Sequence, residues 1–272
     1  RHDVKAVEYL VRSKLSELGL DHIAELTHFA CTSEDINNLS YALIVRDAVR
    51  NTWLPAYQAV IARLRELAAQ YRDEAMLART HGQPATPTTM GKELAVFVYR
   101  LERIQKQIEG TEYLGKFSGA TGTYSAHISA DPSADWPTIS QEFVSSLGLT
   151  WNPLTTQIES HDWQAELYAR VAHANRVLHN LATDIWTYIS MGYFRQIPQA
   201  GATGSSTMPH KINPIRFENA EANLELSSAL LDSLAASLVT SRMQRDLTDS
   251  SSQRNIGVGF GHSLLPLDNI RR

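Results

Sequence analysis

Four long runs of apolar residues at helical spacing constrain what this chain of 272 residues can fold into. In residues 36–71, apolar side chains recur at intervals of three, four or small multiples, as one face of an α-helix requires, and Pro55 is expected to bend this helix. Helices of about 25 to 35 residues far exceed the usual length of about 11 to 12. The predicted fold is therefore all-α and consists of an elongated bundle of long helices. The same spacing predicts further helices over residues 90–114, 163–194 and 215–239, and strand-like sequence only in the Gly-rich interval 116–127.

The small residues on these helices indicate what covers them. Alanine and serine occupy many positions where a solitary bundle would carry glutamate and lysine, as in residues 220–231 and 234–238. Small side chains allow helices to approach closely, and helices that are apolar around much of their circumference need a cover. Partner subunits are the favoured cover, and a bundle closed within one chain is the alternative.

Composition excludes several classes of protein. A hydrophobic content of 43% allows one or two domains with a buried core, and a net charge of −4 argues against nucleic-acid binding, which normally needs a basic face. The single cysteine, Cys31, excludes an intramolecular disulfide framework and is interpreted as a small core residue rather than a nucleophile. The sequence shows neither a signal peptide nor about 20 uninterrupted apolar residues, so we expect no membrane contact and a cytoplasmic location.

The segment 201–214, GATGSSTMPHKINP, joins a glycine- and serine-rich stretch to the predicted start of a helix. The glycine- and serine-rich part taken alone is typical of a linker. Lys211 and Asn213, however, lie close to the predicted helix N-terminus, where a cation, an amide and the helix dipole all favour negative charge. The whole segment therefore predicts a loop that closes over an anion.

This segment is part of a set of five motifs that resembles the fumarase/aspartase superfamily, whose members form or eliminate fumarate. Within that superfamily the motifs are similar to those of the adenylosuccinate lyase family, the bacterial long-chain type in particular. The likeness extends from His2 to about Leu265. Besides GSSTMPHKINP, the motifs are HDVKAVE at residues 2–8, TSEDIN at 32–37, RTHGQPATP at 79–87 and QRDLTDS at 244–250.

The resemblance implies a C–N lyase of purine biosynthesis. Such an enzyme eliminates fumarate from adenylosuccinate, giving AMP, and from the related succinyl-carboxamide ribotide. The resemblance also implies a homotetramer with a central many-helix bundle, active sites shared among three subunits, and no cofactor. Two alternatives stay open: another fumarate-releasing lyase similar to argininosuccinate lyase, against which TSEDIN and QRDLTDS argue, and a non-catalytic helical scaffold.

A β-elimination needs a base for the carbon proton, donors for the developing aci-carboxylate and an acid for the departing nitrogen. On the resemblance, Ser205 is the base, activated by Lys211 or by loop amides once the loop excludes water. By spacing alone, Ser206 could equally be the base. His81, in a turn outside regular helix, is the predicted acid, and Glu218 resembles the glutamate that orients this histidine; its alternative role is to complement the helix N-terminus.

Several further residues are predicted to bind substrate. Lys211 and Asn213 are donors from the loop, and Thr32 and Ser33 offer hydroxyls and amides, although that pair also reads as a plain helix N-cap. Three arginines lie near the predicted phosphate position in residues 241–254, where an ion-pair network with neighbouring aspartates is the alternative. The resemblance adds a nucleotide contact at His2 and Asp3, a substrate contact at Gln157, and phosphate contacts at Arg245, Ser250 and Arg254.

A metal site is not expected, because the pairs His2-Asp3 and His161-Asp162, and His210, have no metal-ligand spacing. We expect residues 1–35 to be the end of an N-terminal region that binds substrate, and 36–265 to be the central catalytic helical bundle. Residues 266–272 are expected to be a divergent tail. Because the chain starts at Arg1 inside a motif, we expect a fragment that lacks N- and C-terminal parts, including a C-terminal helical domain, which leaves open whether it acts alone.

Overall fold

The computed structural model describes residues 2–197, 207–208 and 210–272, and its fold is all-α, as predicted. The chain forms two compact units, each assembled from three separate stretches of sequence. Among the described helices, none combines the length and hydrophobicity that a membrane span requires. Unit 1 comprises Arg1–Ala48, Glu112–Gln164 and Leu238–Ser251, and unit 2 comprises Val49–Thr111, Ala165–Ser237 and Ser252–Arg272.

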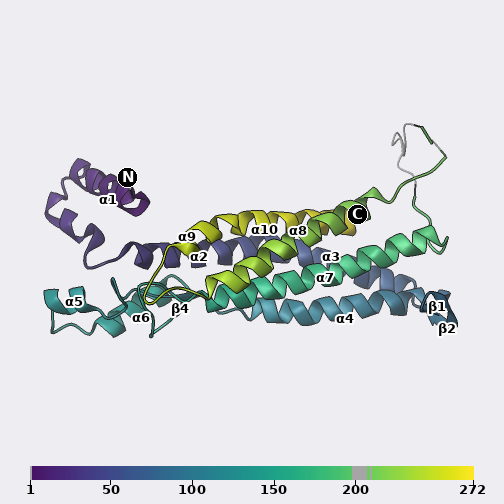
Figure 1. Ribbon diagram of the computed structural model, residues 1–272, viewed down its shortest axis with the longest axis horizontal. Helices are drawn as coiled ribbons and strands as arrows, with labels where there is room; N and C mark the ends of the chain where they lie inside the picture. The colour runs from purple at the N-terminus through teal and green to yellow at the C-terminus, as the bar shows by residue number, and fades with distance from the viewer. Residues whose placement is uncertain (1, 198–206, 209) are drawn as a thin grey trace. The chain divides into compact units, whose positions relative to one another are not determined.

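Unit 2 is a bundle of long helices. Its core is formed by aliphatic and aromatic side chains that lie on one face of each helix, including Leu101, Leu178 and Leu231, all less than 2% exposed. The helices that run alongside one another in Figure 1 are α3 (Leu54–Gln70), α4 (Met90–Glu109), most of α7 (Asp162–Ser190), most of α8 (Ile215–Leu238) and α10 (Ile256–Arg271).

A chain of buried hydrogen bonds crosses this apolar core. The Trp53 indole N–H donates to the Ser263 hydroxyl at 2.8 Å, and Ser263 donates to Asn175 Oδ1 at 2.7 Å. Asn175 Nδ2 donates to Ser227 Oγ at 2.9 Å, and Ser227 donates to the Gly259 carbonyl at 2.7 Å. Each of these buried groups has a hydrogen-bond partner. This series of hydrogen bonds therefore fixes the register of α7, α8 and α10 at no cost from an unpaired group.

The helix predicted over residues 36–71 is divided in the structure. It consists of α2 (Ser33–Ala48), one π-helical turn, η2 (Val49–Trp53), and then α3. Pro55 stands in the first turn of α3, and its ring would clash with the carbonyl four residues earlier if a regular α-helix ran through this point. The expected disturbance therefore lies just before the proline and takes the form of a π-turn.

The prediction that strands occur only within residues 116–127 was wrong. An antiparallel hairpin instead joins β1 (Ala75–Thr80) to β2 (Gln83–Thr89), and a short parallel pair joins β3 (Leu114–Gly115) to β4 (Thr150–Trp151). The Gly-rich interval serves close packing instead: Gly122 has a φ of +77°, and a Cβ there would lie 2.2 Å from the Thr155 carbonyl oxygen. No other residue fits that approach.

Unit 1 contains shorter helices around a polar centre. The predicted domain boundaries at residues 35 and 265 stay a prediction. The remaining elements of unit 1 are α1 (Asp3–Glu17), η1 (Asp21–His28), α5 (Ser125–Ala130), α6 (Trp136–Ser146) and most of α9 (Thr248–Ser252), after which η3 (Gln253–Asn255) leads into α10.

Candidate active site

A fully buried ion pair lies at the centre of unit 1. Lys116 Nζ is 2.7 Å from Asp35 Oδ1, and both side chains are 0% exposed. The Asp35 carboxylate also accepts the backbone N–H groups of Thr32 at 2.9 Å, Ser118 at 3.0 Å and Gly119 at 3.1 Å. Burial lowers the pKa of Lys116, and the neighbouring Asp35 opposes that shift. Asp35 therefore ties the start of α2 to the Gly-rich segment.

Two predicted substrate residues meet beside this pair. Gln157 Nε2 donates to Thr32 Oγ1 at 3.4 Å, so the Thr32 hydroxyl faces the loop before α7. Thr32 lies at the start of α2, as the N-cap interpretation requires. Its backbone N–H, rather than its hydroxyl, makes the bond there, donating to the Asp35 carboxylate in the first turn of α2. Ser33 is the first residue of α2 and is half-buried. This arrangement presents a hydroxyl and an amide on one surface of unit 1.

The Arg245 guanidinium lies between two carboxylates. Its NH2 group is 3.1 Å from Glu34 Oε1, and its NH1 group is 3.4 Å from Asp249 Oδ2. The Arg245 side chain is 17% exposed. Asp249 Oδ2 in turn lies 3.0 Å from His161 Nε2. Burial raises the pKa of Asp249, but the bond to His161 and the charge of Arg245 outweigh it, and the net shift is downward, so this carboxylate is ionised at neutral pH.

The other two predicted phosphate contacts flank this cluster in the sequence. The Ser250 backbone N–H donates to Asp249 Oδ1 at 2.7 Å, and Ser250 is half-buried. Arg254 is exposed in η3. The alternative interpretation, an ion-pair network, also finds support, because Arg242 pairs with Asp246 at 2.9 Å. His2 and Asp3 form an exposed pair at the start of α1, with Nδ1 3.4 Å from Oδ1.

His81 lies at the tip of the β1–β2 hairpin in unit 2. It has a φ of +55° and precedes Gly82 at +72°, which makes a two-residue hairpin turn with both residues in the left-handed region. The tip is held by Arg79, which donates to the Gly82 carbonyl at 3.0 Å and to the Tyr193 hydroxyl at 3.0 Å. His81 is exposed, so its imidazole is held outside regular helix, as predicted, and is accessible.

The segment before α8 and the first turn of α8 carry the other predicted catalytic residues. Ser205 and Ser206 lie outside the described residues. Lys211 is exposed and Asn213 is half-buried, and α8 begins at Ile215, close behind them as expected. The Glu218 carboxylate accepts the Trp186 indole N–H at 3.1 Å, and no hydrogen bond joins it to His81 within the described part of the chain.

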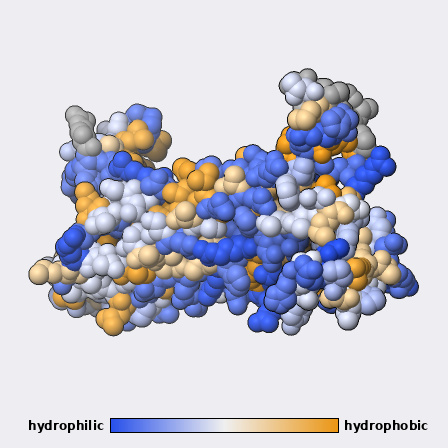
Figure 2. Space-filling model, turned by 45° about the vertical axis from the view of Figure 1, so that its right-hand side comes forward, coloured by the Kyte–Doolittle hydropathy of each residue, from blue (hydrophilic) through white to orange (hydrophobic). Residues whose placement is uncertain are grey.

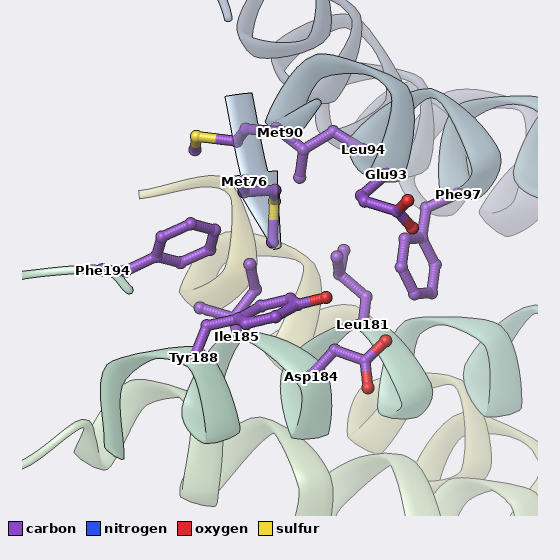
Figure 3. Close-up of a pocket in the computed structure, with 10 residues that line it drawn as sticks. All are labelled: Met76, Met90, Glu93, Leu94, Phe97, Leu181, Asp184, Ile185, Tyr188 and Phe194. Atoms are coloured by element: carbon purple, nitrogen blue, oxygen red, sulfur yellow. The ribbon is translucent and has the colours of Figure 1, made fainter. Parts of the chain in front are cut away.

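A small cavity in unit 2 is not the site. It lies between β1, α4 and α7, with the carboxylates of Glu93 and Asp184 and the Tyr188 hydroxyl on one side and Met76 and Phe194 on the other (Figure 3). Burial raises the pKa of both Asp184 and Tyr188. The cavity volume of about 20 Å³ accommodates about one water molecule, which excludes a nucleotide.

Sequence reasoning missed the residues that support these predicted contacts. The sequence analysis assigned no role to Asp35, and it considered His161 only as a metal ligand. Lys116 carried no signal beyond being a lone lysine in a Gly-rich interval, and its partner is 81 positions earlier in the chain.

Burial raises the pKa of the Cys31 thiol to about 12, which agrees with its interpretation as a non-nucleophile. Among the described residues, no group of three or more histidine, cysteine, aspartate or glutamate side chains could hold a metal ion.

Comparison with known proteins defines the class to which this fold and these residues belong. A family model described as Lyase matches residues 1–225, and the chain belongs to this lyase family. A second model, described as Adenylosuccinate lyase C-terminal, matches residues 241–272. The similarity to the solved structure of the 3-carboxy-cis,cis-muconate lactonizing enzyme from Pseudomonas putida is one of fold, with a TM-score of 0.77 at 22% identity over 98% of this chain and 58% of that one.

Among individual proteins, the chain is similar to adenylosuccinate lyases. It is 54% identical to that of Escherichia coli (strain K12) over 265 residues, which is 97% of this chain and 58% of the relative. It is 50% identical to that of Haemophilus influenzae over 272 residues, which is 100% of this chain and 60% of the relative. The chain thus spans about three fifths of the length of these relatives, and the comparisons bear out the resemblance drawn from the motifs.

Proposed function

We propose that this chain belongs to an adenylosuccinate lyase, which eliminates fumarate from adenylosuccinate to leave AMP. The related succinyl-carboxamide ribotide is the proposed second substrate, and the cytoplasm the proposed location. The observation that carries the proposal is the 54% identity over 97% of the chain to an adenylosuccinate lyase.

The proposed roles follow the three tasks of the elimination. Ser205 removes the carbon proton, and His81 protonates the departing nitrogen. Lys211 and the loop amides stabilise the negative charge that develops on the succinyl carboxylate, while Glu218 orients the histidine. Because His81 stands on an exposed hairpin tip and Glu218 is bonded to Trp186, we propose that the histidine and glutamate of one site come from different subunits.

Most of the residues proposed to hold the substrate belong to unit 1, and Asn213 and Arg254 belong to unit 2. Thr32, Ser33 and Gln157 would bind the succinyl group together with Asn213, and His2 and Asp3 would contact the nucleotide. The hydrogen bond between Gln157 and Thr32 supports this assignment, because it brings two of the proposed contacts together from positions 125 residues apart. The phosphate contacts are proposed to be Arg245, Ser250 and Arg254.

A direct assay tests the proposed activity. We expect the full-length gene product to convert adenylosuccinate to AMP and fumarate, followed as the fall in ultraviolet absorbance when the succinyl group leaves. Argininosuccinate should give no fumarate under the same conditions. Turnover of argininosuccinate alone would favour the other fumarate-releasing lyase, and turnover of neither compound would favour the non-catalytic scaffold.

Assembly into a homotetramer is the second expectation. The α7–α8 face of unit 2 carries an open groove of about 410 Å³ lined in part by Ser228 and Ala229, and Leu226 on α8 is 53% exposed. Figure 2 shows hydrophobic patches (orange) among hydrophilic residues (blue) on the visible face. Small residues in the groove, together with an exposed leucine elsewhere on the same helix, favour close packing of further helices.

Sedimentation at micromolar concentration is therefore expected to show tetramers. Leu226→Glu should shift the population toward smaller species, because it places a charge where another helix packs. The exchange Ala62→Glu on the exposed part of α3 is the matched control, since it also adds one carboxylate to a helix surface. A well-folded wild-type monomer would contradict both the tetramer and the shared sites.

A further inference from the structure

His161 is a buried histidine that the proposed reaction does not use. Its side chain is 3% exposed, and its backbone lies in the left-handed region with a φ of +63°. The His161 backbone N–H donates to Glu159 Oε2 at 2.9 Å, and Asn152 Nδ2 donates to the other oxygen of that carboxylate at 3.0 Å. These bonds hold the residue immediately before α7 in a single position.

The hydrogen bonds of the ring define its tautomer. Gln164 Nε2 lies 3.3 Å from His161 Nδ1, and an amide nitrogen can only donate, so Nδ1 is the acceptor. In the neutral ring the proton then resides on Nε2, which donates to Asp249 Oδ2 at 3.0 Å. His161 is therefore oriented from two sides, and its one donor is directed at Asp249.

The same Asp249 oxygen also contacts Arg245. Its distance to Arg245 NH1 is 3.4 Å, and the second carboxylate oxygen accepts the Ser250 backbone N–H at 2.7 Å. Two proposed phosphate contacts, Arg245 and Ser250, thus share one carboxylate whose own position depends on His161. Glu34 holds the other side of the guanidinium at 3.1 Å.

We infer that His161 is a positioning residue for phosphate recognition: through Asp249 it sets the orientation of the Arg245 guanidinium and of the Ser250 turn. Without the His161 N–H donor, the Asp249 carboxylate would be free to rotate toward Arg245 and pair more fully with its guanidinium. That pairing would withdraw the guanidinium from a bound phosphate. This inference rests on the proposed function, since that function supplies the phosphate-bearing ligand.

The test is the affinity for AMP, measured by calorimetry on the full-length gene product, because this readout does not depend on turnover. The variants are His161→Gln, whose amide nitrogen reaches the place of Nε2, and His161→Asn, whose amide is too short to reach Asp249. We expect AMP affinity to stay within about twofold for His161→Gln and to fall about tenfold for His161→Asn. Affinity for fumarate, which has no phosphate, should be unchanged in both.

The control is His127→Leu. His127 is also buried in unit 1, at 1% exposure, but its ring nitrogens find no hydrogen-bond partner among the described residues, so its loss should leave AMP affinity unchanged. Equal AMP affinity in His161→Asn and His161→Gln would overturn the inference. A loss of fumarate affinity in His161→Asn that parallels its loss of AMP affinity would also overturn it, and so would a wild-type protein that does not bind AMP. A protein that binds AMP but releases no fumarate from adenylosuccinate would disprove the proposed activity, while the inference would still be decided by the two variants.

Discussion

Replacing His81 by alanine in the full-length gene product is expected to lower kcat for fumarate release by at least about 10²-fold, with little change in substrate binding. The imidazole is proposed to protonate the departing nitrogen, and it is exposed at the tip of the β1–β2 hairpin. Ser205→Ala should lower kcat by a similar factor, because it removes the proposed base for the carbon proton. Steady-state kinetics with adenylosuccinate measure both effects.

The two inactive variants also test how the site is shared. If His81 and Ser205 of one site come from different subunits, mixing the variants rebuilds some sites in which both residues are intact. Part of the activity should then return once the subunits have exchanged. Near wild-type turnover in either single variant would refute its catalytic role. No recovery in a mixture with verified exchange would mean that one chain supplies both residues.

Disrupting the buried pair of Asp35 and Lys116 is expected to have the largest effect on stability. Asp35→Asn leaves the Lys116 ammonium fully buried, with the Gly119 carbonyl at 3.0 Å and a neutral amide in place of a carboxylate. An uncompensated buried charge of this kind costs about 3–5 kcal/mol. Lys116→Met should cost less, because Asp35 keeps three backbone N–H donors, from Thr32, Ser118 and Gly119.

The rank order of the variants in stability is a sharper test than the size of any single change. Combining Lys116→Met with Asp35→Asn removes the buried ammonium, so the double variant should unfold at a higher denaturant concentration than Asp35→Asn alone. Chemical denaturation followed by circular dichroism measures the three midpoints. Arg63→Ala, which removes one partner of an exposed ion pair with Glu66, is the control and should change stability by less than about 1 kcal/mol. A double variant less stable than both single variants would contradict the account of the pair.

Local features of the sequence determined the helical bundle and the family. Apolar residues three and four positions apart define one face of a helix without reference to any partner, so α4, α7 and α8 were predicted close to their observed bounds, whereas α10 was not predicted. His81 was placed outside a helix for an equally local reason. The hairpin that carries it was missed, although a His-Gly turn beside the threonine-rich segment 86–89 is a recognisable signal for paired strands.

Tertiary structure alone decided which charges are buried and which partners they have. In sequence, Glu34 and Asp35 look alike at a helix start, yet one holds Arg245 and the other a lysine 81 positions away. His161 reaches Asp249 from a position 88 residues earlier. Such pairings depend on how separate stretches of chain pack together, and a buried charge is tolerated only where packing delivers its counter-charge. The sequence by itself therefore determined the helices and the proposed chemistry, and only the packing of unit 1 determined how the proposed substrate contacts are held.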